Sequence, residues 1–402
     1  MISTERQDPQ AASVRPAAKG WCPGAYRPMT SGDGLIVRVR PRLARLTAGQ
    51  ALGLCDTARR FGSGLIDLTN RANLQLRGVQ AGDHPEVMAA LGRLGLLDAD
   101  PALEDRRSIL VAPCWQAGDD TERIATELAA RLAELPGLPS KFGFAVDAGP
   151  APVLAGASAD VRIERGRSGG LIVRADGAAG GVPVTPSSAV DAAIALAAWF
   201  AATAGAARGR MVLHLASHAL PAALAPVEAF AQAGALPIPG LSAHGPVYGV
   251  AFGQIKAAAL ESLLRDCGAA ALRLAPNRVL IVEGGEWRDS SEFLTASDDP
   301  LLRVDACPGA PACASATVET RALARAIAPV FLSAAAGDTP RSLHVSGCAK
   351  GCARPRAADL TLVGRGGSFD LVRAGAAWDP PARSGLAPAA LPSLIGTEDA
   401  CL

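Results

Sequence analysis

The chain has 402 residues and a formal net charge of +1, with 39 Lys and Arg against 38 Asp and Glu. Hydrophobic residues make up 49% of the chain, which is enough to build the cores of two or three domains. The balance of charge argues against a nucleic-acid-binding protein that acts through its overall field, and against a disordered chain.

The first twenty residues are polar and lack the apolar stretch of a secretory signal. We therefore expect a cytoplasmic protein whose nine cysteines are reduced rather than paired in disulfides. Residues 189–206 are almost entirely apolar, but they are mostly Ala and include Asp191, so we expect a buried helix rather than a membrane span.

Two segments predict the same β-α-β-β order. In the first, we expect a strand at Leu35–Arg40, a helix from an N-cap at Thr47 to about Phe61, and strands at Leu65–Thr69 and Asn73–Leu76. In the second, we expect a strand at Val247–Phe252, a helix from about Lys256 to Asp266, and strands at Ala271–Leu274 and Val279–Val282. An Asn-Arg step precedes the last strand of both segments, and the pattern indicates an internal duplication.

A larger α/β region follows each copy. The predicted division is an arm at 1–30, half-repeats at 31–80 and 240–285, and α/β domains at 81–239 and 286–402, the second ending in an irregular tail from Ala376. Predicted helices lie at Asp119–Glu134 and Ser315–Ala328, and predicted strands lie around Phe142–Asp147 and Val161–Glu164 and near residues 341–346, 359–363 and 369–373.

Four cysteines near the end of the chain form the pattern C-x5-C-x34-C-x3-C: Cys307, Cys313, Cys348 and Cys352. A disulfide is disfavoured in a reducing compartment, and structural zinc usually has two to four residues between paired ligands. A [4Fe–4S] cluster needs four thiolates presented from turns, and the Gly and Pro residues around these thiols suit that need. The cluster is favoured, with zinc and an unliganded arrangement left open.

The spacing of these cysteines resembles the cluster signature of the sulfite and nitrite reductase superfamily. The resemblance of the chain to that superfamily spans about residues 30–375. The resemblance implies an α+β fold in which duplicated β-α-β-β half-units form a ferredoxin-like domain, together with two larger α/β domains. Thr69-Asn70-Arg71 with Gln75 and the segment Leu138–Phe142 are similar to superfamily segments whose basic residues hold the carboxylates of sirohaem. At Gly143 the chain departs from the superfamily, which has a second basic residue there.

The opening segment, Lys19–Gly24 and Pro28–Gly34, resembles the precorrin-3B synthase family within that superfamily. The resemblance implies an O2-dependent monooxygenase of aerobic cobalamin biosynthesis. It would hydroxylate precorrin-3A at C20 and form a γ-lactone, giving precorrin-3B. It also implies a [4Fe–4S] cluster and a mononuclear non-haem iron. The ligands of that iron and the acid–base residues of lactone formation stay unassigned. The alternative function is that of a sirohaem-dependent sulfite or nitrite reductase. A third hypothesis is a cluster-bearing electron carrier or a zinc-held binding protein without catalysis of its own.

A precorrin is a polyanion with acetate and propionate arms, so its binding needs converging Arg and Lys side chains. The candidates for binding the substrate are Arg38, Arg40, Arg71, Lys141 and Lys350. The chain has no G-x-G-x-x-G between a strand and a helix, and Gly364–Gly367 is expected to be a turn between strands. We therefore expect electrons from NADH to arrive through a separate reductase.

Candidate iron ligands among the five histidines are weak. His214 and His218 are four apart, as they would be on one helix face, but Met211–Leu215 has a strand-like composition. His344 is expected to be structural. No nucleic-acid or membrane partner is expected.

Overall fold

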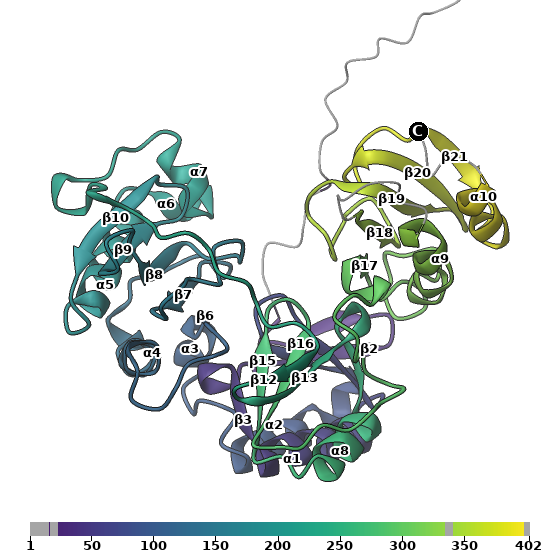
Figure 1. The fold of residues 1–402 in the computed structure, drawn as a ribbon, viewed down its shortest axis with the longest axis horizontal. Helices are drawn as coiled ribbons and strands as arrows, with labels where there is room; N and C mark the ends of the chain where they lie inside the picture. The colour runs from purple at the N-terminus through teal and green to yellow at the C-terminus, as the bar shows by residue number, and fades with distance from the viewer. Residues whose placement is uncertain (1–15, 17–22, 334–340, 398–402) are drawn as a thin grey trace, which may run out of the picture. The chain divides into compact units, whose positions relative to one another are not determined.

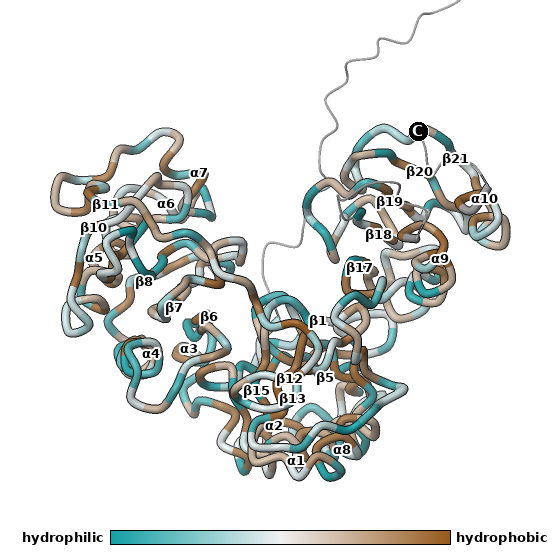
Figure 2. The backbone as a smooth tube through the Cα atoms, in the orientation of Figure 1, coloured by the Kyte–Doolittle hydropathy of each residue, from teal (hydrophilic) through white to brown (hydrophobic). Residues whose placement is uncertain are grey.

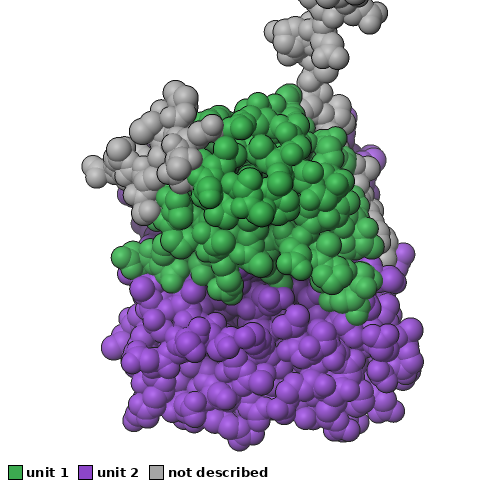
Figure 3. Space-filling model, turned by 90° about the vertical axis from the view of Figure 1, so that its right-hand side faces the viewer, with its two compact units in different colours: residues 1–20, 31–33, 298–402 green, residues 21–30, 34–297 purple. Residues whose placement is uncertain are grey.

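The structure is a computed structural model that describes Pro16, residues 23–333 and residues 341–397. The segment 17–22 and the last residues, with Cys22 and Cys401, lie outside the described residues. Two units are distinguished in Figure 3: Pro16 and residues 31–33 belong with the chain from Asp298 onward, and residues 21–30 and 34–297 form the other unit. Within the described ranges, none of the helices has both the length and the apolar character that crossing a bilayer demands.

Both predicted β-α-β-β repeats are present (Figure 1). The first consists of β2 (Gly34–Val39), α1 (Ala48–Phe61), β4 (Leu65–Leu68) and β5 (Leu74–Val79). The second consists of β13 (Gly245–Gly249), α8 (Ala257–Asp266), β15 (Ala271–Ala275) and β16 (Val279–Glu283). Thr47 caps α1 as expected, because its hydroxyl accepts the N–H of Gln50 while the Gln50 side chain accepts the N–H of Thr47.

The two repeats exchange a strand, which the sequence pattern did not predict. The short strand β3 (Arg45–Thr47) of the first repeat pairs antiparallel with β15, and β14 (Gln254–Lys256) of the second repeat pairs antiparallel with β4. Each sheet has five strands, in the orders β1-β2-β5-β4-β14 and β12-β13-β16-β15-β3, with β1 at Met29–Ser31 and β12 at Gly240–Ser242. A left-handed residue precedes each exchanged strand, Leu43 with φ 55° and Phe252 with φ 58°.

One apolar core serves both repeats. Leu46 of β3, Leu54 of α1, Ile255 of β14 and Leu260 of α8 all belong to it and are at most 1% exposed. Apolar stretches, brown in Figure 2, mark the inner strands of these sheets. Burial of such side chains from both copies makes the pair of sheets a single packed body.

The region after the first repeat forms a six-stranded mixed sheet in the order β11-β10-β9-β8-β7-β6. Its strands are β6 (Ile109–Val111), β7 (Phe144–Asp147), β8 (Val161–Arg165), β9 (Leu171–Ala175), β10 (Gly180–Val184) and β11 (Glu228–Ala229). Its helices are α2 (His84–Arg93), α3 (Pro101–Arg106), α4 (Asp120–Ala130), α5 (Ala189–Ala202), α6 (Gly205–Arg208) and α7 (Met211–Leu215). The strand-like interpretation of Met211–Leu215 is therefore wrong, because this segment forms a short helix.

The sheet of the last region has the order β17-β18-β19-β20-β21, in which the first three strands are parallel. Its elements are β17 (Val304–Ala306), α9 (Arg321–Ser333), β18 (Leu343–Ser346), β19 (Ala358–Arg365), β20 (Ser368–Gly375), β21 (Arg383–Leu386) and α10 (Leu391–Thr397). Gly366 and Gly367 form the predicted turn, with φ of 55° and 85°.

Two predictions for the last region are wrong in part. The helix expected from Ser315 begins only at Arg321, because the preceding residues brace the cysteine loop: Ala310 N–H donates to Val318 O, and the Thr320 hydroxyl donates to Cys307 O. The chain after Ala376 is not wholly irregular, since it contributes β21 and α10.

Candidate functional site: four thiols and a basic cluster

Parallel strand pairing brings the two cysteine segments together. Cys307 directly follows β17, and Cys348 follows β18 by two residues. These strands run parallel with Ala306 opposite Val345, so both segments leave the same edge of the sheet. The N–H of Gly347 donates to the Sγ of Cys307 over 3.1 Å, which joins one segment to the other.

The four thiols influence one another electrostatically, and none is in a disulfide. Burial raises the pKa of Cys307, while the N–H groups of Gly347 and Gly309 lower it. Burial of its thiol also raises the pKa of Cys352, and the neighbouring Cys348, Cys307 and Cys313 raise it further. A metal centre among these thiols would favour their ionised form, which burial and their mutual proximity disfavour.

Glycines give the backbone its close approach to the sulfurs. A Cβ on Gly347 would lie 2.6 Å from the Cβ of Ala316 and 3.4 Å from the Sγ of Cys307. Gly309 and Gly351 have φ of 71° and 58°, a conformation that favours glycine. The residues present therefore suit a cluster whose sulfurs accept backbone hydrogen bonds.

A turn from the start of the chain braces the loop that carries Cys313. The hydroxyl of Ser31 donates to the carbonyl of Ala312 over 2.6 Å, and the N–H of Gly32 donates to the same oxygen over 3.2 Å. A Cβ on Gly32 would lie 2.2 Å from the carbonyl oxygen of Pro311. The sequence pattern did not predict this contact, because 281 residues separate Ser31 from Ala312.

The two segments expected to hold carboxylates meet in the structure. Arg71 lies in the loop between β4 and β5, and Lys141 lies ahead of β7. Nη2 of Arg71 donates to the carbonyl of Lys141 over 3.0 Å and to Oγ of Ser158 over 3.1 Å. Nη1 donates to Oγ of Ser108 over 3.3 Å. The ammonium of Lys141 makes no hydrogen bond or ion pair with any residue that the structure describes.

Gly143, where the chain is expected to depart from the superfamily, has close neighbours on its Cα. A Cβ there would lie 2.9 Å from Oγ of Ser108 and 3.1 Å from its carbonyl oxygen. Its N–H donates to the carboxylate of Asp160 over 3.0 Å. A side chain at this position would require Ser108 to shift, so the packing here favours glycine.

The other three candidates are Arg38, Arg40 and Lys350, of which the last two make hydrogen bonds to residues other than Arg71 and Lys141. Arg40 is only 7% exposed, and its Nη1 is 3.0 Å from Oε1 of Glu104. Its guanidinium therefore completes a buried ion pair, and we no longer assign it to substrate. Arg38 is half-buried on β2 opposite Gln75. Lys350 lies in the cysteine loop, where its Nζ donates to Oγ of Ser315 over 2.9 Å.

The histidines do not build an iron site in the described ranges. His214 lies on α7 and His218 lies beyond its end; their rings stack with centroids 4.1 Å apart, and Nε2 of His214 contacts the Thr203 hydroxyl at 2.8 Å. His344 is fully buried, and burial lowers its pKa to about 4. Among the described residues, no three His, Cys, Asp or Glu side chains are grouped as ligands of one metal ion. A [4Fe–4S] cluster differs from a single metal ion, because each of its four thiolates binds a different iron of the cubane and the sulfurs therefore lie farther apart.

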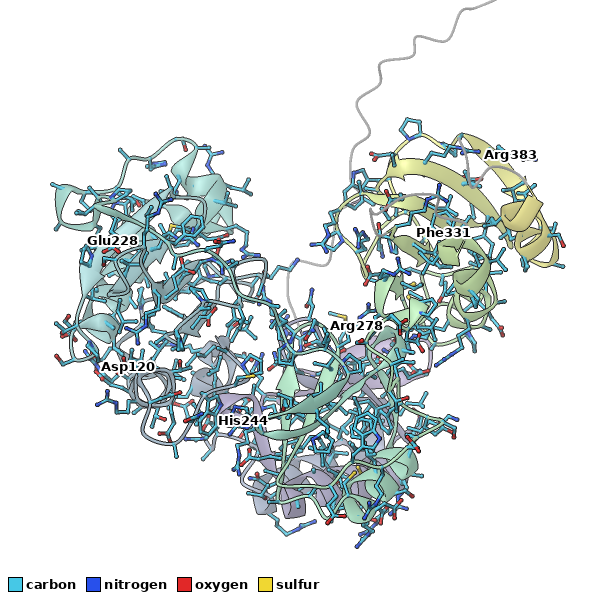
Figure 4. All side chains as sticks on the ribbon, in the orientation of Figure 1. Asp120, Glu228, His244, Arg278, Phe331 and Arg383 are labelled. Carbon is cyan, nitrogen blue, oxygen red and sulfur yellow. The ribbon has the colours of Figure 1, made fainter. Side chains whose placement is uncertain are left out.

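Two cavities lie elsewhere. One, of about 240 Å³, is lined by Phe331 and Arg383, and the other, of about 510 Å³, is lined by His244 and Glu283. The side chains of Phe331, Arg383 and His244 are labelled in Figure 4. Neither is lined by any of the four thiols, Arg71 or Lys141.

Comparison with known proteins identifies the fold and the family. Residues 27–94 match the nitrite/sulfite reductase ferredoxin-like half domain. The Mycobacterium tuberculosis NirA protein superposes with a TM-score of 0.65 at 17% identity, over 90% of this chain and 79% of that one. The predicted sulfite and nitrite reductase-like fold is thereby confirmed.

Full-length similarity separates one relative from the others. The ferredoxin–nitrite reductase of Leptolyngbya laminosa is 31% identical over only 26% of this chain and 20% of its own length. The coenzyme F420-dependent sulfite reductase of Methanocaldococcus jannaschii is 40% identical over 18% of this chain and 12% of its own. A precorrin-3B synthase from Sinorhizobium sp. is 35% identical over 91% of this chain and 85% of its own length. Similarity of that extent means that the chain belongs to the precorrin-3B synthase family.

Proposed function

We propose that this protein converts precorrin-3A to precorrin-3B, hydroxylating C20 and forming a γ-lactone with O2 as the oxidant. One oxygen atom enters the product and the other leaves as water, so each turnover consumes two electrons and two protons. The similarity to a precorrin-3B synthase over nearly the whole of both chains carries the proposal. NADH supplies the electrons through a separate reductase, in the cytoplasm.

Cys307, Cys313, Cys348 and Cys352 would hold a [4Fe–4S] cluster, which when bound relays single electrons. The N–H groups of Gly347 and Gly309 stabilise the thiolate of Cys307. A mononuclear iron is also expected from the family resemblance, but the described residues offer no set of three ligands for it.

Arg71 and Lys141 would bind carboxylate arms of the tetrapyrrole. Arg71 is held in place by two hydroxyls and one carbonyl, so its guanidinium is oriented before the substrate arrives. Arg71 contacts the backbone carbonyl of Lys141, and the Lys141 ammonium, which has no partner among the described residues, would supply a second positive charge for the carboxylates. Arg38 and Lys350 are proposed as further substrate contacts.

The test begins with anaerobic purification, an optical spectrum and iron and sulfide analysis. A broad cluster absorbance without haem bands, and a product that carries one heavy atom from isotopically labelled O2, are expected. Strong haem bands would instead identify a sirohaem-dependent reductase, and zinc without sulfide would leave the thiols as a structural clasp.

Substitution of single cysteines tests the proposed ligands. Cys313→Ala is expected to lose most of the iron and sulfide, because a cubane needs its four thiolates. Cys114→Ala is the matched control, since Cys114 is an exposed free thiol outside the pattern and its removal should leave both contents unchanged. Full iron and sulfide in Cys313→Ala would remove that residue from the ligand set.

A further inference from the structure

The neighbourhood of Arg71 holds a third cation that the sequence pattern did not single out. Arg210 precedes α7, and its Nη1 donates to Oγ of Ser158 over 3.1 Å. Nη2 of Arg71 donates to the same oxygen over 3.1 Å. One hydroxyl thus receives both guanidinium groups, which places the two cations within about two hydrogen-bond lengths of each other.

Arg210 is fixed on its inner side by a buried carboxylate. Its Nε lies 2.8 Å from Oδ1 of Asp160, whose side chain is 1% exposed, and its Nη2 donates to the carbonyl of Ala159 over 2.8 Å. The other carboxylate oxygen of Asp160 accepts the N–H of Gly143 over 3.0 Å. Arg210 is therefore tied, through one carboxylate, to the position where the superfamily carries its second basic residue.

The outer side of Arg210 remains available. Its side chain is 26% exposed, and of its five N–H groups three are used within the part of the chain that the structure describes. One N–H is left on each terminal nitrogen. Two such donors in a planar fork match the two oxygens of a carboxylate.

We propose that Arg210 binds a carboxylate arm of the tetrapyrrole in place of the basic residue that Gly143 cannot provide. The inference rests on the proposed function, because it assumes a polycarboxylate substrate at Arg71 and Lys141. A side chain at position 143 would have to displace Ser108, whereas Asp160 and Ser158 direct the Arg210 guanidinium toward Arg71. Three cations, Arg71, Lys141 and Arg210, then form the binding cluster, and an incoming carboxylate relieves the repulsion between them.

Binding of uroporphyrin, a porphyrin with acetate and propionate arms, tests the inference without turnover. Affinity is measured by fluorescence at several salt concentrations for the wild type and for Arg71→Gln, Arg210→Gln and Arg210→Lys. The control is Arg123→Gln, an arginine 62% exposed that pairs with Asp120 on α4. Arg210→Gln is expected to weaken binding about tenfold and to reduce its salt dependence, because one charged contact is lost. Arg123→Gln should bind as the wild type does.

Arg210→Lys distinguishes a loss of binding from a loss of folding, because a lysine keeps a positive charge beside the buried Asp160. It is expected to fold and to bind severalfold more weakly than the wild type, because the planar fork is gone. Wild-type affinity in both Arg210 variants, together with weak binding by Arg71→Gln, would overturn the role of Arg210 and leave the proposed function standing. A wild-type protein that does not bind uroporphyrin, or an Arg71→Gln variant that binds it unchanged, would count against the polycarboxylate site itself and against the inference with it.

Discussion

At the scale of single residues, the cations of this protein differ in whether the fold gives them an acidic partner. Arg40 and Glu104 form a buried pair and are committed to the structure. Lys141 has no such partner among the described residues. Burying a charge is costly unless it is paired, so Arg40 stabilises the fold through Glu104, whereas Lys141 is proposed to keep its donors for a carboxylate of the substrate.

Glu283 gives a pH-dependent prediction. Hydrogen bonds from Arg45 and Arg273 lower its pKa to about 2, below the ordinary glutamate value of about 4.3. Its ionised form therefore stabilises the fold fully above about pH 4.3, and this contribution is lost as the pH falls toward 2. Glu283→Gln should lower the free energy of unfolding at pH 7 by about 1–2 kcal/mol, since the contacts are charged but partly screened by solvent.

Urea unfolding between pH 7 and pH 3 checks this. The difference from the wild type should shrink as the pH falls below about 4.3. Glu286→Gln, at an exposed pair with Arg288, is the control and should have little effect. A difference that stays constant with pH would contradict the assignment of the lowered pKa to Glu283.

At the scale of elements, the cysteine loops depend on segments that are distant in the chain. The parallel pairing of β17 and β18 sets Cys307 beside Gly347, and the turn at Ser31 and Gly32 contacts the loop of Cys313. The loop has no regular structure of its own, so these contacts determine where its sulfur lies.

Gly32→Ala tests the bracing turn. The new methyl group would overlap the carbonyl oxygen of Pro311, so the loop of Cys313 must shift. We expect about half or less of the wild-type iron and sulfide per chain, and faster loss of the cluster in air. Gly49→Ala is the matched control, because a Cβ there meets nothing within 4 Å. Equal iron and sulfide contents in the two variants would show that the turn does not position Cys313.

At the scale of the whole molecule, the duplicated halves cannot be regarded as separate modules. Each five-stranded sheet includes one strand from the other repeat, β14 in the first and β3 in the second. Arg45 on β3 also reaches across to Glu283 on β16 with contacts of 2.8 and 2.9 Å. We therefore expect the two sheets to unfold together.

Ile255→Ala tests this coupling. Ile255 lies on β14 of the second repeat but pairs opposite Ile66 of the first, and it is 1% exposed. Truncation should destabilise by about 2–4 kcal/mol through lost burial and a residual cavity. Hydrogen exchange should then speed up in both sheets by the same factor. Leu241→Ala, 78% exposed on β12, is the control and should change neither sheet. Faster exchange confined to one sheet would show that the halves unfold independently.

The sequence by itself determined the local features of this protein. Alternating apolar residues, the capping residue Thr47 and the Asn-Arg steps were enough to place the repeated β-α-β-β elements, because these signals act within a few residues. The spacing of the four cysteines predicts a cluster, and the resemblance around Arg71 and Lys141 predicts a polyanion site; both stay predictions.

Only the tertiary structure decided the remainder. The exchange of β3 and β14, the bracing of Cys313 by Ser31 and the pairing of Arg210 with Asp160 join residues that lie far apart along the chain. Arg40 and Arg71 are both arginines beside strands in the first repeat, yet one completes a buried ion pair and the other orients toward Lys141. The partner of a charged side chain depends on packing between distant segments, so it cannot be predicted from the local sequence pattern.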